Sequence, residues 1–278
     1  NTVQQAEWLS VADKQQLQKD PNIVVPQVPD IETYTIKMNN AYGPTSDVHV
    51  RRAISYAFDY DALIKVMSGF ATKLSGPLPA SLPGADTSIT GYTHDLDKAK
   101  AELAQSAQYG KGGFDLDFVY VTGLEEERQT GLIMLDALKQ LNINVKVTAV
   151  EWTNAVASFA KKETSPAMFP IYSGTDFPDP DNYLFQSFHS SMNGTWQGAD
   201  QFSNPDVDKA LVEARSVVDA NQRTTLYNQI QKTIVDQAVE VWGFVPLSGD
   251  PHRKELSGYV YCPVMGSAPW WYEMSLTS

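Results

Sequence analysis

The sequence predicts an α/β fold, in which helices pack against the faces of a layered sheet. Segments with alternating apolar residues take turns with segments whose apolar residues recur every three or four positions. Hydrophobic residues make up 42% of the chain and charged residues 19%, which are the proportions of an ordinary folded protein. At 278 residues the chain is long enough to bury a sizeable core, in one large domain or two small ones.

The first third of the chain is expected to pass from a loosely helical start into strands and then helices. Apolar residues have roughly helical spacing over residues 3–17, and residues 22–28 are typical of a short strand. Residues 33–39 alternate apolar and polar side chains, which predicts a half-buried strand. Asp47 is placed to cap the next helix, and a second helix is expected over residues 61–67.

The middle of the chain shows the helix and strand alternation most clearly. A loop over residues 76–84 is too rich in proline for regular structure. After it we expect a helix over 95–104, a strand over 114–121, a long helix over 125–141 and a strand over 144–150.

The last part of the chain completes the pattern. The expected elements are a helix over 154–160, a strand over 168–172, a rigid loop over 174–182, two helices over 207–218 and 222–239, and strand-like pieces after residue 241.

Composition excludes several classes of partner. The net charge is 21 − 33 = −12, which argues against nucleic acid and against anionic membrane surfaces. Cys262 is the single cysteine, so no internal disulfide and no thiolate zinc site can form. No run approaches the roughly 20 apolar residues of a membrane span.

Motifs for catalysis or cofactors are scarce. The four histidines lie far apart in the sequence, and no phosphate-binding glycine loop or G-x-S-x-G elbow is present. We therefore expect no metal, no cofactor and no catalytic residue. A hydrolase that uses paired carboxylates stays open as an alternative, although the sequence singles out no such pair.

The loop over residues 174–182 is the densest chemical feature. Two prolines stiffen it, and three aspartates project from it, Asp176, Asp179 and Asp181. The spacing fails the template of a calcium loop. Asp179 and Asp181 are expected to cap backbone groups of a proline turn. Asp176 directly follows a strand end, where α/β sheets place ligand groups, and its carboxylate suits an ammonium group.

Several ordered motifs resemble the family 5 solute-binding proteins of ABC importers, which include dipeptide- and oligopeptide-binding proteins. Within the first motif, Arg51 or Arg52 is expected to form a structural ion pair. The similar segments are DVHVRRAISYAFD at 47–59, followed by GFA at 69–71 and GPLP at 76–79, VTAVEW at 147–152, GTDFPDPDN at 174–182, NPDVD at 204–208, and the Arg-to-Asp pattern of 223–236.

The resemblance implies a type II periplasmic-binding-protein-like lobe, with a mixed sheet flanked by helices and with the amino-terminal lobe missing. Residues 33–245 would form the ligand-binding second lobe. Residues 1–32 would belong to the first lobe or the hinge, and residues 246–278 would form a tail that crosses back toward the first lobe.

The resemblance also implies a ligand site. In dipeptide- and oligopeptide-binding members, the aspartate that matches Asp176 holds the α-amino group of the ligand, and Arg128 lies near the place of an arginine that holds the ligand carboxylate. Phe177, Trp152 and Tyr172 are candidate pocket walls. The alternatives are an ion pair at a helix start for Arg128 and ordinary core positions for the aromatic residues.

The implied function is capture of a peptide or peptide-like solute for uptake, without chemical change. The implied partners are the solute and the membrane permease of an ABC importer, and the implied location is the periplasm, or the cell exterior with a lipid anchor. We expect a monomer. The same family also binds oligosaccharides, opines and metal chelates, and a signalling or adhesion module that reuses the fold is a further alternative.

Overall fold

The structure is a computed structural model that describes residues 3–7, 9–108, 110, 112–265 and 270–276. Its α-helices are α1 (Val11–Leu17), α2 (Val48–Ala57), α3 (Tyr60–Val66), α4 (Leu96–Leu103), α5 (Glu125–Lys139), α6 (Trp152–Ser158), α7 (Pro180–Phe188), α8 (Pro205–Ser216) and α9 (Ala220–Asp236). Short 3-10 helices are η1 (Pro44–Ser46), η2 (Ser190–Met192), η3 (Pro263–Met265) and η4 (Trp271–Glu273).

The strands form one large sheet and two small ones. They are β1 (Ile23–Val24), β2 (Val28–Pro29), β3 (Thr33–Met38), β4 (Ala71–Lys73), β5 (Phe114–Val121), β6 (Ile143–Val150), β7 (Met168–Ser173), β8 (Glu240–Ser248), β9 (His252–Arg253), β10 (Leu256–Ser257) and β11 (Ser275–Leu276). The large sheet has the order β2-β8-β3-β7-β5-β6, and β4 pairs with β8. β5 is parallel to both β6 and β7, while the other pairs are antiparallel. The sheet is therefore mixed, as predicted.

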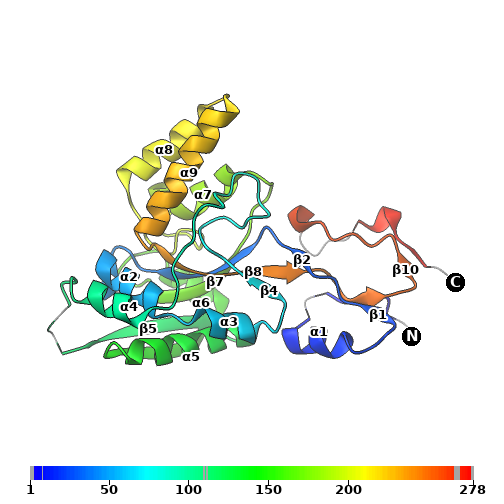
Figure 1. Cartoon of the computed structure of the whole chain (residues 1–278), viewed down its shortest axis with the longest axis horizontal. Helices are drawn as coiled ribbons and strands as arrows, with labels where there is room; N and C mark the ends of the chain where they lie inside the picture. The colour runs from blue at the N-terminus through cyan, green and yellow to red at the C-terminus, as the bar shows by residue number, and fades with distance from the viewer. Residues whose placement is uncertain (1–2, 8, 109, 111, 266–269, 277–278) are drawn as a thin grey trace.

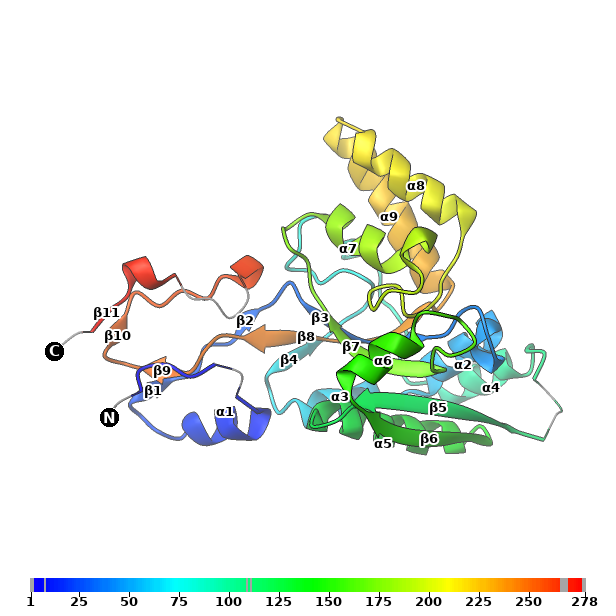
Figure 2. The same ribbon diagram turned by 180° about the vertical axis from the view of Figure 1, so that it is seen from behind.

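Helices cover both faces of this sheet (Figures 1 and 2). The alternation of β5 shows why. Leu116 and Phe118 point into the main core, which includes Met134 of α5. Val119 and Val121 point to the opposite face and pack against a second apolar cluster that contains Ala155 of α6 and Phe159. Since β5 carries apolar residues on both faces, the sheet must be sandwiched between helices, and the predicted α/β class is confirmed.

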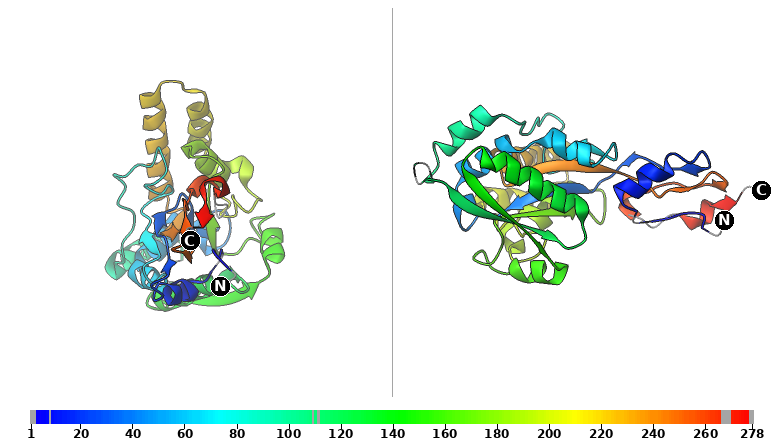
Figure 3. Two further views of the ribbon diagram at one scale, coloured as in Figure 1. Left: turned by 90° about the vertical axis from the view of Figure 1, so that its right-hand side faces the viewer. Right: turned by 90° about the horizontal axis from the view of Figure 1, so that it is seen from below.

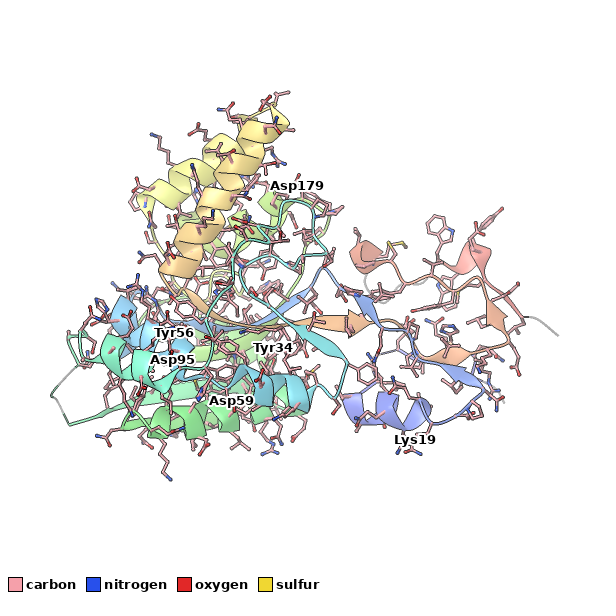
Figure 4. All side chains as sticks on the ribbon, viewed as in Figure 1. Lys19, Tyr34, Tyr56, Asp59, Asp95 and Asp179 are labelled. Carbon is pink, nitrogen blue, oxygen red and sulfur yellow. The ribbon has the colours of Figure 1, made fainter. Side chains whose placement is uncertain are left out.

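Aspartate caps fix where several helices begin. Asp47 accepts a hydrogen bond from the His49 backbone N–H at the start of α2, as predicted. Asp59 and Asp95 do the same for α3 and α4 (Figure 4). Because these caps act within one turn, they are readable from the sequence alone.

Strand β3 was predicted to be half-buried, and this is wrong. All six of its residues are buried, because β3 lies between β8 and β7 in the middle of the sheet, with both faces covered. Its polar side chains find buried partners instead of water. Lys37 is the extreme case, with its ammonium held between Asp200 and Glu240.

Two elements were not predicted. β4 is a short edge strand within the segment expected to lead into the proline-rich loop. α7 begins inside the segment 174–182 that was expected to be a loop throughout. The reason is local: Asp179 caps the helix and Pro180 occupies its first position, where proline needs no hydrogen-bond partner.

The two ends of the chain lie together in an arm, defined here as residues 3–7, 9–27, 249–265 and 270–276. β1 pairs with β9, and β10 pairs with β11, so both ends contribute to the same structure. Figure 3 shows the arm projecting from one end of the sheet. Several large apolar side chains are exposed on it, including Trp270, Trp271 and Tyr272. The loosely helical start contains only the short α1, which is capped by Ser10.

Candidate functional site

Three parallel strands end at one edge of the sheet. β5 pairs in register with β6 along its whole length, from Phe114 with Ile143 to Val121 with Val150, and Phe118 pairs with Met168 of β7. The segments that follow these strands are the start of α5, the start of α6 and the loop before α7. We call this region the carboxyl edge, residues 30–33, 121–128, 150–152 and 173–179. Ligands of α/β sheets bind at such edges.

The loop after β7 presents Asp176 and Phe177 to solvent. Asn182 holds the loop, because its side-chain oxygen accepts hydrogen bonds from the Thr175 hydroxyl at 2.6 Å and from the Asp176 backbone N–H at 2.9 Å. The Phe177 side chain is 49% exposed. Within the described ranges, the Asp176 carboxylate forms no ion pair. The loop therefore has a fixed backbone and an uncommitted carboxylate.

The other two aspartates of this loop have structural roles: Asp179 caps a backbone N–H, as predicted, whereas Asp181 pairs with an arginine side chain instead of capping the backbone. Asp179 caps α7 and accepts hydrogen bonds from the Arg223 guanidinium at 2.8 and 3.1 Å. Asp181 accepts from Arg215 Nε at 2.8 and 2.9 Å. These two pairs connect α7 to α8 and α9, so Asp176 is the aspartate of the loop whose carboxylate forms no ion pair with the described residues.

Trp152 is the first residue of α6 and is 41% exposed. Its ring meets Trp196 edge to face, with centroids 6.2 Å apart. Trp196 lies in a loop without helical or strand periodicity, so no sequence pattern pointed to it. The pair leaves an indole surface at the carboxyl edge that can line a binding site.

Tyr172 is half-buried and packs against the main core. Its ring contacts Tyr34 and Phe244 with centroids 4.8 and 5.9 Å apart. Burial, together with the nearby Glu126 and Glu32 carboxylates, raises the pKa of its hydroxyl well above the usual value. Tyr172 therefore keeps its proton, and its hydroxyl marks a place where carboxylates from two elements approach each other.

Arg128 lies in the first turn of α5, within the helix predicted over residues 125–141. Its guanidinium forms a two-point pair with Glu125, with Nε–Oε2 and Nη2–Oε1 distances of 2.8 and 2.7 Å. This is the ion pair at a helix start that the sequence offered as the alternative. Glu125 occupies two of the guanidinium N–H donors, and the Arg128 side chain is 41% exposed.

Two carboxyl groups at this edge, the half-buried Glu32 and the buried Glu127, were not predicted. Burial and the neighbouring Asp30 raise the pKa of Glu32 to about 7. Burial raises the pKa of Glu127 to about 8, even though its carboxylate accepts the Val121 backbone N–H at 2.8 Å. Nothing in the sequence marks these two glutamates among the 33 acidic residues of the chain, because their burial depends on tertiary packing.

Glu127 gives the folded state a pH dependence that can be measured. Its folded pKa is raised, so its stabilising contribution is complete below the ordinary glutamate pKa and is lost as pH rises through about 8. Glu127→Gln keeps an acceptor for Val121 and stays neutral. We expect the variant and the parent to have similar free energies of unfolding at low pH. As pH rises, the free energy of unfolding of the variant should become larger than that of the parent. Urea unfolding at several pH values measures this difference.

Glu151→Gln is the matched control, since Glu151 is exposed at the start of α6. The free energy of unfolding of Glu151→Gln is expected to be close to that of the parent at every pH. A difference between Glu127→Gln and the parent that does not change with pH would contradict the assignment.

Other kinds of site find no support in the part of the chain that the structure describes. No group of three or more His, Cys, Asp or Glu residues there is arranged to hold a metal ion. None of the helices in the described ranges is long and apolar enough to cross a membrane.

Comparison with known proteins matches the chain to one family. The family described as bacterial extracellular solute-binding proteins, family 5 (Middle), matches residues 1–195. The chain is 28% identical over 264 residues to the probable D,D-dipeptide-binding periplasmic protein DdpA of Escherichia coli, covering 94% of this chain and 50% of that protein. It is 30% identical over 265 residues to the heme-binding protein A of Haemophilus influenzae, and this match covers 91% of this chain and 46% of that protein.

Solved structures show the same pattern. The periplasmic binding protein DppA of Helicobacter pylori, in complex with the peptide STSA, superposes with a TM-score of 0.86 at 25% identity, covering 99% of this chain and 53% of that one. The chain thus spans about half the length of the relatives that it matches.

Proposed function

Because the chain belongs to the bacterial extracellular solute-binding proteins of family 5, we propose that it captures a peptide or peptide-like solute for an ABC importer. The relatives named above include a probable dipeptide-binding protein and a peptide complex, which supports this class of solute. The solute would leave the protein chemically unchanged.

The observation that carries the proposal is the uncommitted carboxylate of Asp176. It lies on an anchored loop after a parallel strand, while the neighbouring aspartates are committed to arginines. A carboxylate in this position suits the α-ammonium group of a peptide, because charge-assisted hydrogen bonds are stronger than neutral ones.

We propose a different role in solute binding for each of the other predicted site residues. Phe177 and Trp152, both exposed, are proposed to cover the apolar parts of the solute. Arg128 is proposed to hold a carboxylate of the solute, which would take the place of Glu125. The guanidinium would then be paired both without and with the solute. Tyr172 would support the floor of the site from the core.

Asp176→Asn tests the proposal directly. In the full-length protein, the variant should bind peptides with a free amino terminus about tenfold or more weakly, because the ammonium loses its charged partner. Isothermal titration with a peptide pool, run in parallel with the amino-acetylated pool, measures the effect. The acetylated peptides lack the ammonium and should bind the two proteins alike.

Asp136→Asn is the matched control, because it removes the same charge from an exposed position on α5. It should leave binding of both pools unchanged. Equal affinity of the parent and Asp176→Asn for free-amine peptides would defeat the role of Asp176.

The arm is proposed to belong with the first lobe or the hinge. Residues 1–32 and 246–278 would join the first lobe or the hinge, and residues 33–245 would be the ligand-binding lobe. In support, β3 enters the sheet where β7 ends, with Thr33 opposite Ser173, so the connection to the arm lies at the carboxyl edge. Hinge closure would then cover a solute at this edge.

The setting of the function is proposed from the family. The permease of an ABC importer would receive the loaded protein, and the periplasm or the cell exterior, with a lipid anchor, would be its location. We propose a monomer, in keeping with its strong net negative charge.

Mass spectrometry of solutes that co-purify with the full-length protein distinguishes the ligand classes. A peptide is expected. An oligosaccharide, an opine or a metal chelate would move the chain to another branch of the family. Release of cleaved products from peptides or glycans during incubation would contradict capture without chemical change.

A further inference from the structure

Glu32 lies at the carboxyl edge, one residue before β3. Thr33 of β3 pairs with Ser173 of β7 in antiparallel register. Beyond that pair, Glu32 and Gly174 come opposite each other. Gly174 is exposed, and a methyl group added to it would lie 4.0 Å from Cβ and Cγ of Glu32. The Glu32 side chain therefore lies alongside the first residue of the loop that carries Asp176.

The carboxyl group of Glu32 keeps contact with solvent and has no partner. The residue is half-buried, and neither of its carboxyl oxygens is among the buried side-chain oxygens that lack a hydrogen-bond donor. Within the described ranges, this carboxyl group forms no hydrogen bond and no ion pair. A solute at the carboxyl edge can therefore reach these oxygens without replacing a side chain of the protein.

The charged groups on the side of the arm are committed elsewhere. The Asp30 carboxylate accepts a hydrogen bond from the Tyr261 hydroxyl at 2.6 Å and from the backbone N–H of the residue that follows it at 2.8 Å. The Lys14 ammonium of α1 interacts with Asp250 and Asp30. Among the residues that the structure describes, no cation pairs with Glu32. Its closest charged neighbour is thus another carboxylate.

The sheet side adds further acidic groups. The carboxyl groups of Glu126 and Glu32 both act on the Tyr172 hydroxyl, which keeps its proton. Burial and the Asp30 charge raise the pKa of Glu32 to about 7, so its carboxyl group is protonated in about half of the molecules at pH 7. A cation brought to this carboxyl group would favour the ionised form.

One end of a solute can contact both Glu32 and Asp176. Asp176 follows Gly174 by two positions, which is at most about 7 Å of extended chain. The amino-terminal residue of a peptide is of comparable length. Its ammonium group has three N–H donors, more than a single carboxylate oxygen can accept.

We infer that Glu32 is a second carboxylate for the ammonium end of the solute, beside Asp176, and that it releases its proton to solvent when the solute binds. This inference rests on the proposed capture of a peptide with a free amino terminus. The ammonium group keeps its own protons. Binding therefore couples to pH through Glu32, whereas Asp176 attracts the ammonium group at every pH at which it is ionised.

Proton release tests the inference in the full-length protein. Isothermal titration of the free-amine peptide pool at pH 7, in phosphate and in Tris, measures the protons released per bound peptide, because the two buffers differ in ionisation enthalpy. The parent should release about half a proton more than Glu32→Gln, since a pKa of about 7 leaves half of the Glu32 groups protonated. The amino-acetylated pool should cause no such difference.

The affinities should show the same coupling. Between pH 6 and pH 8, the affinity of the parent for free-amine peptides should rise about fivefold or more relative to that of Glu32→Gln, because the parent gains its carboxylate over this range. The comparison cancels the titration of the peptide ammonium itself. Asp176→Asn should instead weaken binding by the same factor at both pH values. Glu163→Gln, at an exposed position after α6, is the matched control and should behave as the parent.

The outcomes separate this inference from the proposed function. If the parent binds free-amine peptides but releases no more protons than Glu32→Gln, the role of Glu32 is overturned and peptide capture stands. If the parent binds neither pool, peptide capture fails, and the role of Glu32 fails with it. A lack of buffer dependence in the parent alone is sufficient to reject the inference, so the test does not depend on the folding of Glu32→Gln.

Discussion

Replacing Lys37 with methionine is expected to lower the free energy of unfolding by about 3–5 kcal/mol. The Lys37 ammonium is buried in the centre of the sheet, 3.2 Å from Asp200 Oδ2 and 2.5 Å from Glu240 Oε1. Both carboxylates are buried as well, and burial raises the pKa of Asp200 to about 7. Without Lys37 they remain in an apolar environment with no cation, which costs far more than the pair itself contributes.

Urea unfolding of Lys37→Met measures this loss, and its pH dependence identifies the cause. Removal of the cation favours the protonated carboxyl groups in the folded state, so the loss should grow as pH rises from about 5 to 8. Lys146→Met, at an exposed position of β6, is the matched control and should change stability by less than about 0.5 kcal/mol. A loss in Lys37→Met no larger than in this control would contradict the account.

The second large effect is expected at Arg51. Its guanidinium is buried and donates to backbone carbonyls of two separate segments, those of Thr45 and Ser46 before α2 and those of Gln237 and Ala238 after α9. Arg51→Leu leaves these carbonyls without donors, since leucine has none. We expect the free energy of unfolding to fall by roughly 3 kcal/mol, measured by urea unfolding.

Its neighbour Arg52 provides the comparison. Arg52 donates to the Asp236 carbonyl at 2.8 and 3.0 Å and lies 4.0 Å from Glu102, but its side chain is more exposed. Arg52→Leu should therefore cost less than about 1 kcal/mol. If the two variants are equally destabilised, the buried carbonyl contacts are not the source of the effect.

The sequence predicted those parts of the fold whose signals are local. Asp47 caps α2 within one turn, and the alternation of β5 is complete within eight residues. The burial of Lys37 could not be predicted in this way, because its partners lie 163 and 203 positions away. The polar face of β3 therefore looked solvated in the sequence, although it packs against distant carboxylates.

The site residues also differ in whether a local signal or a long-range contact determines their surroundings. Asp176 and Trp152 each follow a strand, and topology brings the ends of parallel strands to one edge, so their neighbourhood follows from the order of elements. Tyr172 is expected to line the pocket, but its packing against Tyr34 and Phe244 could not be predicted, because it depends on strands far apart in the chain. The raised pKa of Glu127 likewise depends on burial that no spacing encodes.

The pairing of β3 with β8 also sets an order for folding. β3 is among the first strands of the large sheet to be synthesised, and β8 is the last. Closing so long a loop is slow compared with the neighbouring β5–α5–β6 unit, whose contacts are close in sequence. The centre of the core is therefore completed after its periphery. During synthesis, β3 would therefore have one unpaired edge, and Lys37 would lack its partner Glu240, until β8 has been made.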